Sequence, residues 1–149
     1  MKLIYLILII FLNTNVFSEE QNNSHFYIDS DKLIITEHPL ISEFIGNAYA
    51  RNAVYHFYGN RILVNYDNNE KIELITIIKN VKIIRPNEEI FADRAVYDLK
   101  LENIIVSGNV SVKKNGDVLR GSQLTVDLIN STSTIKGNKD KQVSVKVAN

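Results

Sequence analysis

The chain has 149 residues and no cysteine, and its 17 basic residues balance 17 acidic ones. This length suits one small domain with its own core, and the charge balance gives no support to a nucleic-acid partner, which normally requires a basic excess. Without cysteine the fold has no disulfides to stabilise it. Tyr, Phe, Ile and Val are abundant, a composition typical of a β-rich protein.

The first predicted element is a secretory signal peptide over residues 1–18. Lys2 supplies a positive charge, residues 3–12 form an unbroken apolar run, and Val16 and Ser18 stand at the minus-three and minus-one positions of a cleavage site. A retained membrane anchor is the alternative, but a membrane span needs about 20 apolar residues and the run stops at Asn13. We therefore expect cleavage after Ser18, a flexible lead-in over residues 19–24, and one β domain over residues 25–149.

Two short patterns alternate along this domain. One ends in an aspartate and recurs at Asp67, Asp98 and Asp127, about 30 residues apart, and the other occupies residues 44–50, 77–83 and 106–112. Both alternate apolar and polar residues with period two, which indicates half-buried strands. The sequence therefore predicts an all-β, curled antiparallel sheet built from repeated two-strand units. We expect one face of every strand to be apolar and the other to be solvated.

Turn residues divide the middle of the chain into strands of about ten residues or more, longer than usual. The clearest turn signals are Asp67-Asn68-Asn69, Arg85-Pro86-Asn87, residues 100–103, and Asn115-Gly116. Asn-Gly is the strongest short hairpin signal because both residues tolerate a positive φ.

A second Gly-Asn pair, Gly108-Asn109, lies inside a strand pattern. The apolar alternation continues in phase from Val106 to Val110 through this pair. A glycine in such a position indicates a bulge or bend, so we predict that the strand continues through Gly108. The alternative is a loop between two shorter strands.

The sequence contains no constellation of catalytic or metal-binding residues. His25, His38 and His56 are isolated from one another, and there is no phosphate-binding glycine loop, nucleophile elbow or cysteine nucleophile. The recurring aspartates are interpreted as turn caps, because each one closes a predicted strand. We expect no enzyme activity, no metal and no cofactor.

Three segments resemble the OstA-like repeats of the lipopolysaccharide-transport family that includes LptA. They are FIGNA at residues 44–48, FADRAVYD at residues 91–98, and VSGNV at residues 106–110. The resemblance extends from about residue 30 to residue 137. The chain departs from the family pattern at Ala48, where valine is usual, and at Lys79, which replaces the glycine of the middle repeat.

This resemblance implies an elongated, open β-jellyroll in the periplasm that shelters lipid acyl chains in an apolar groove. Such a protein bridges the inner and outer membranes for outer-membrane biogenesis. Its partners would be the lipid A acyl chains of lipopolysaccharide, homologous jellyroll domains of the inner- and outer-membrane transport complexes, and further copies joined head to tail through edge strands at residues 27–36 and 142–147. The residues expected to line the groove are Val64, Tyr66, Ile77, Val81, Ile83, Phe91, Tyr97, Val106, Val110, Val112, Leu124 and Val126.

Two other functions remain open at this point. One is a membrane-anchored, LptC-like component of the same pathway, and the other is a ligand-free structural β-repeat protein with an ordinary packed core. Six cationic residues could meet lipid phosphates at the rim or could be solvated surface charges. They are Lys79, Lys82, Arg85, Lys113, Lys114 and Arg120.

Overall fold

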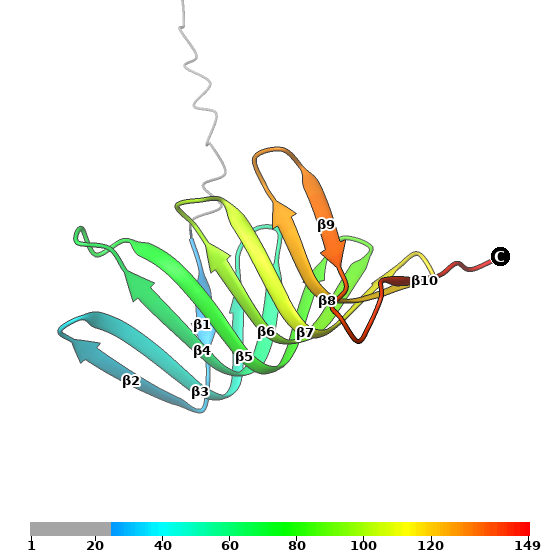
Figure 1. Ribbon diagram of the computed structural model, residues 1–149. Helices are drawn as coiled ribbons and strands as arrows, with labels where there is room; N and C mark the ends of the chain where they lie inside the picture. The colour runs from blue at the N-terminus through cyan, green and yellow to red at the C-terminus, as the bar shows by residue number, and fades with distance from the viewer. Residues whose placement is uncertain (1–24) are drawn as a thin grey trace, which may run out of the picture.

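The computed structural model describes residues 25–149 as ten β-strands in one antiparallel sheet (Figure 1). The predicted signal peptide and lead-in, residues 1–18 and 19–24, lie outside the described residues. The strands are β1 (Tyr27–Asp29), β2 (Lys32–Glu37), β3 (Leu40–Arg51), β4 (His56–Tyr66), β5 (Ile72–Arg85), β6 (Glu88–Asp98), β7 (Asn103–Lys114), β8 (Asp117–Asp127), β9 (Thr132–Lys136) and β10 (Ser144–Lys146).

The six long strands, β3 to β8, are neighbours in chain order, so each pair forms an antiparallel hairpin. Both edges of the sheet carry two short strands: β1 and β2 pair with β3, while β9 and β10 pair with β8. The strands curve together into an open trough (Figure 1). The expected all-β, open antiparallel fold of repeated hairpin units is thereby confirmed.

Every long strand bends near its middle, and the hydrogen-bond register between neighbours shifts at the bend. In β3, β5 and β7 the bend consists of two successive residues with positive φ: Gly46-Asn47, Lys79-Asn80 and Gly108-Asn109. These strands each carry one more residue at the bend than their neighbours, which is the arrangement of a β-bulge. The prediction that the strand continues through Gly108 is confirmed, and Asn115-Gly116 is the turn that follows it.

The line of bends divides the sheet into two arms that face each other. The β2/β9 arm is flanked by β2 and β9, and it comprises residues 40–45, 61–66, 72–78, 94–98, 103–107 and 123–127. The β1/β10 arm is flanked by β1 and β10, and it comprises residues 48–51, 56–58, 81–85, 88–91, 110–114 and 117–121.

A ladder of polar side chains follows the bends. Asn47 Nδ2 donates a hydrogen bond to Asp31 Oδ2 at 2.8 Å, and Asn109 Nδ2 donates to Asp93 Oδ2 at 2.8 Å. The glycine before each asparagine makes room for the carboxylate, because a Cβ on Gly108 would lie 2.5 Å from Asp93 Oδ2. The recurrence of Gly-Asn in the sequence therefore reflects a recurring close contact with an aspartate of the neighbouring segment, Asp31 in the turn between β1 and β2 or Asp93 on β6.

The middle bend uses different residues for the same backbone path. Asn80 Nδ2 donates to Asn60 Oδ1 at 3.0 Å, and Lys79 occupies the glycine position with a φ of 62°. A side chain in this left-handed region costs about 1–2 kcal/mol. The departure from the family pattern at Lys79 thus keeps the bend but strains it.

We expect Lys79→Gly to raise the free energy of unfolding by about 0.5–1 kcal/mol. The gain is smaller than the full strain because glycine also has more freedom in the unfolded chain. Urea unfolding monitored by far-UV circular dichroism measures it. Lys136→Gly, in the extended edge strand β9, is the matched control and should destabilise; a loss of stability in both variants would show that Lys79 is not strained.

The three recurring aspartates cap the turns that close β4, β6 and β8. The Oδ1 atoms of Asp67, Asp98 and Asp127 each accept two backbone N–H hydrogen bonds from the turn that follows, at 2.8 to 3.0 Å. These bonds satisfy turn donors that the sheet leaves unpaired. The interpretation of these residues as structural caps is confirmed.

The turn caps predict a loss of stability in acid. Hydrogen bonds from the Lys71 and Asn69 backbone hold the pKa of Asp67 below its ordinary value of 3.8, and those from Asn130 do the same for Asp127. Each carboxylate therefore stabilises the fold above about pH 3.8, and this contribution is lost as the pH falls through the lower folded pKa. We expect Asp67→Asn/Asp127→Asn to unfold with a shallower dependence on pH below 5 than the unaltered protein; an unchanged slope in thermal melts would contradict the assignment.

The edges differ from the expected terminal strands. Residues 27–36 form two strands instead of one, because the chain turns at Ser30 and Asp31 beside the β3 bend, where the Asp31 N–H donates to Gly46 O at 2.9 Å. The last strand is limited to β10, and β9 was not predicted. Each edge thus has one short strand per arm.

Candidate functional site

The inward faces of the two arms enclose an apolar interior that runs through all six long strands. Its buried hydrophobic side chains have relative exposures of 0 to 8 %. Ten of the predicted groove residues belong to this buried set, and Tyr66 packs against it while half-buried. The ten are Val64, Ile77, Val81, Ile83, Tyr97, Val106, Val110, Val112, Leu124 and Val126. Their contact with a lipid stays a prediction.

Phe91 is the exception, because it lies on the outer face of β6. Its strand neighbours Ile90 and Ala92 point inward with exposures of 1 and 8 %, whereas the ammonium groups of Lys82 and Lys113 lie 5.7 and 5.1 Å from the Phe91 ring centre. The prediction failed because period-two counting was carried across the bend. The register shift between Phe91 and Arg94 exchanges the inward and outward positions.

The same shift explains two inward residues that the predicted site lacks. Phe57 and Ile90 are buried at 0 and 1 % exposure, and each lies before the bend of an even-numbered strand. In β3, β5 and β7 the two-residue bend preserves the alternation, so the sequence pattern can be followed directly through it. On β4 and β6 the two halves must be counted separately.

The expectation that every strand has a solvated second face is wrong for the β2/β9 arm. Its outward positions include Leu63, Val96 and Ile105, which are partly exposed apolar residues. On β8 of the same arm the outward positions Gln123 and Thr125 are polar. The two arms thus share an apolar inner face, and their outer faces carry both apolar and polar residues.

An aromatic cluster joins the inner faces of the two arms. The Tyr97 ring from the β2/β9 arm lies 6.1 Å from Phe57, 6.4 Å from Tyr55 and 5.8 Å from Phe26, measured between ring centres. Burial, followed by the nearby Tyr55 hydroxyl, raises the pKa of Tyr97, so the phenol stays neutral. Side chains of the arms therefore contact each other directly at this level of the trough.

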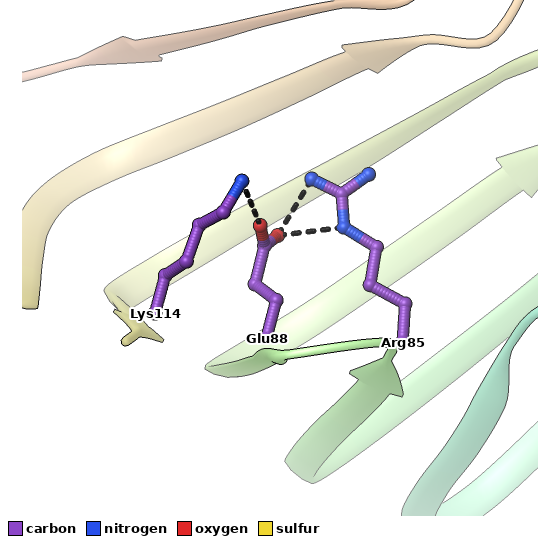
Figure 2. A network of polar contacts seen from close by, with 3 residues as sticks. All are labelled: Arg85, Glu88 and Lys114. Atoms are coloured by element: carbon purple, nitrogen blue, oxygen red, sulfur yellow. Dashed lines mark hydrogen bonds and ion pairs between the residues drawn. The ribbon is translucent and has the colours of Figure 1, made fainter. Parts of the chain in front are cut away.

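The margin of the β1/β10 arm carries an ion-pair network of inward-facing residues (Figure 2). Arg85 Nε donates to Glu88 Oε1 at 2.8 Å, Arg85 Nη2 lies 2.7 Å from the same oxygen, and Lys114 Nζ lies 3.8 Å from Glu88 Oε2. The Glu88 side chain is only 5 % exposed. Burial acts to lower the pKa of Arg85, but hydrogen bonds to Glu88 and Tyr55 outweigh it and raise the pKa.

The margin of the β2/β9 arm carries apolar side chains by contrast. Tyr66, Ile72, Leu99 and Leu128 are half-buried there and pack against the interior. A pocket of about 750 Å³ opens beside them, and five of its seven lining residues are charged or polar. Its lining residues are His25, Asp67, Lys71, Ile72, Glu73, Leu99 and Lys100. The β2/β9 side of the trough opening therefore combines apolar side chains with charged turn residues, and the other side carries the ion-pair network.

Only two of the six candidate rim cations lie at the opening, namely Arg85 and Lys114. Lys82 and Lys113 contact Phe91 on the outer face, Arg120 is also outward, and Lys79 is at the bend. Lys82 additionally pairs with Glu89 at 3.1 Å.

In the described part of the chain, no cluster of three or more His, Cys, Asp or Glu residues could hold a metal ion. His56 is bound by its Nδ1 to the Tyr49 hydroxyl at 2.7 Å, a structural contact on the outer face. Among residues 25–149 there is also no helix with the length and hydropathy to cross a membrane.

The apolar inner faces of the two arms are chemically suited to contact with an apolar molecule.

Comparison with known proteins agrees with this architecture. The crystal structure of LptH from Pseudomonas aeruginosa, described as the LptA-homologous periplasmic component of the lipopolysaccharide transport device, superposes with a TM-score of 0.75 at 10 % sequence identity. The match covers 87 % of this chain and 99 % of LptH, and it establishes the fold. No curated protein sequence matches the chain.

Residues 27–132, which include the strands from β1 to β8, match the family described as "LptA/(LptD N-terminal domain) LPS transport protein". The proteins of this family are transport components, in keeping with the expectation that the chain is not an enzyme. The chain belongs to the LptA/LptD N-terminal domain family of lipopolysaccharide transport proteins.

Proposed function

We propose that this protein is a periplasmic carrier that holds the acyl chains of lipopolysaccharide between its two arms and passes them along the trough. The observation that carries the proposal is the unbroken apolar interior through β3 to β8, in a member of a lipopolysaccharide transport family. Each methylene removed from water contributes about 0.8 kcal/mol, so a long alkyl chain binds such a surface strongly.

The margins indicate how the lipid would be oriented. Acyl chains would enter past the apolar margin at Tyr66, Ile72 and Leu99, while Arg85 and Lys114 at the opposite margin would face the anionic head group. Because side chains of the two arms touch at Tyr97 and Phe57, the lipid would have to displace these contacts as it enters.

Site-specific photo-crosslinking in the native cell envelope tests this function. A photoreactive amino acid at Val110 or Tyr97 should crosslink to lipopolysaccharide, because both positions point inward. The matched controls are their outward neighbours Ser111 and Val96, which should give at least about tenfold less product. Equal crosslinking from both faces, or none from the inward positions, would overturn the proposal.

We further infer that the protein joins homologous jellyroll domains, or further copies of itself, through its sheet edges. All six residues of β2 are exposed, and so is β10 at the other end of the sheet. Edge strands present unpaired backbone groups that another strand can extend. Val145→Pro in β10 should abolish such head-to-tail association in size-exclusion chromatography with light scattering; unchanged association would exclude this edge.

Export to the periplasm is inferred from residues 1–18, with support from the family and from the LptH similarity. N-terminal sequencing of the protein from its own envelope should begin at Glu19. An intact Met1 would instead favour the membrane-anchored alternative.

A further inference from the structure

The outer face of the β2/β9 arm carries a contiguous group of apolar side chains, here called the outer band. Cross-strand pairing places Leu63, Val96 and Ile105 in one central row, where Thr76 stands between Leu63 and Val96 and Glu43 stands on the other side of Leu63. Ile34 and Ile105 are each 38 % exposed. The outer band consists of Ile34, Ile41, Ile45, Leu63, Leu74, Ile78, Val96 and Ile105.

No described element covers the outer band. Close backbone approaches between strands occur only among sheet neighbours, and no strand lies over the outer side of this arm in Figure 1. The central row on the outer face of the β1/β10 arm contains Tyr58, Lys82, Phe91, Ser111 and Arg120, so charged and polar residues interrupt its aromatic ones. Large exposed apolar patches are uncommon on monomers and usually mark interaction sites, so the aliphatic outer band calls for a partner.

Charges of opposite sign lie in the two border rows of this face, where they alternate with the flanking members of the outer band. On the side of the bends, one cross-strand row contains Lys32, Arg61, Arg94 and Lys136. On the side of the hairpin turns, the corresponding row contains Asp98 and Asp127. With Glu43, which pairs with Arg61, the face has four cations and three acids. Glu43 lies in the central row, and the other charges are separated by sign between the two border rows. This near balance fits a partner with the same pattern better than an anionic lipid surface.

We propose that the outer band binds the outer band of a second copy of this chain. A two-fold axis that lies between the sheets and runs across the strands superposes the two bands and brings each cationic border opposite the acidic border of the other copy. Arg94 and Asp98 both lie on β6, so Arg94 of one copy faces Asp98 of the other, and the contact occurs twice. Sheets commonly pack face to face in such an aligned way.

The area is sufficient for a modest dimer. Eight strands spaced by about 4.8 Å, each contributing roughly five or six residues of about 3.3 Å, give a face of about 600 Å² per copy. Stable interfaces bury about 800 Å² per partner, so this contact is near the lower end of that class. The contact leaves the interior and both sheet edges free and does not depend on the proposed lipid transport.

Sedimentation equilibrium of the purified protein tests the proposal. The measurement uses Val145→Pro as background, so that association through the β10 edge does not contribute. Ile105→Glu, which places a carboxylate in the outer band, should weaken dimerisation at least about tenfold. Arg94→Glu should act in the same direction and remove most of the dependence on salt. The matched controls, Val118→Glu and Arg120→Glu, lie outward on the β1/β10 arm and should leave dimerisation unchanged.

A protein that stays monomeric at all concentrations, or a dimer that the control substitutions weaken as much as Ile105→Glu, would overturn the proposal. Circular dichroism of each variant establishes that it is folded. Flotation with anionic phosphatidylglycerol vesicles covers the other possible occupant. Vesicle binding that Ile105→Glu abolishes, without a dimer in solution, would assign the outer band to a lipid surface instead.

Discussion

Gly108→Ala is expected to lower the free energy of unfolding by about 2–4 kcal/mol. Two costs combine, because the φ of 78° is unfavourable for any residue with a side chain, and the new Cβ would lie 2.5 Å from Asp93 Oδ2. The carboxylate cannot move away without losing the hydrogen bond from Asn109 Nδ2. Urea unfolding measures the loss.

Gly116→Ala is the matched control for this prediction. Gly116 has a similar φ of 89°, but the atom nearest to its Cβ position is Ala148 Cβ at 3.1 Å, close to the chain end. We expect a loss of about 1–2 kcal/mol, which reflects backbone strain alone. In Asp93→Ala/Gly108→Ala the two effects should be less than additive, since the carboxylate is already absent. Strict additivity would show that the contact with Asp93 is not the cause.

Glu88→Gln is expected to destabilise the protein by about 1–3 kcal/mol. The substitution leaves Arg85 and Lys114 without the carboxylate that both contact at the margin of the β1/β10 arm. Removal of one partner from a buried ion pair is costly because the remaining charge has lost water without compensation. We expect a smaller loss of stability than for a fully buried ion pair, because the Arg85 side chain retains 23 % exposure.

Glu89→Gln, at the adjacent residue, is the control. Thermal and urea unfolding measure the loss of stability in both variants. Glu89 pairs with Lys82 at 3.1 Å, but both side chains are largely exposed, so Glu89→Gln should cost about 0–1 kcal/mol. The small effect at Glu89 should fade as salt is added, whereas the effect at Glu88 should persist. Equal losses at the two positions would contradict the assignment of Glu88 as a buried anchor.

Local chemistry was sufficient to predict the hairpins and most of the interior. Asn115-Gly116 forms a turn because both residues adopt positive φ, and Asp67 and Asp127 close strands because their carboxylates accept turn N–H groups. Val106 and Val110 were correctly assigned to one face, since the bend at Gly108-Asn109 keeps the alternation in phase. Each of these inferences depends on residues close together in the chain.

The errors have a common origin in contacts between strands. Phe91 was assigned inward because nothing in its own strand reveals that β6 has one residue fewer at the bend than β5 and β7. The division of residues 27–36 into β1 and β2 depends on the position of Asp31 beside Gly46, which is 15 residues away. Register between neighbours is a tertiary property, so a single-strand pattern cannot provide it.

By itself, then, the sequence determined the strands, the turns and the repeated unit, because period-two alternation and turn residues act over a few positions. Only the tertiary structure decided which half of each strand belongs to which arm, and thereby which apolar residues point inward. Leu63 and Val64 are both apolar, but Val64 lies in the interior and Leu63 lies in the outer band. The physical reason is that a side chain is buried only where other strands cover it. The bends determine which face of each half-strand is covered, and they do so for all the long strands together.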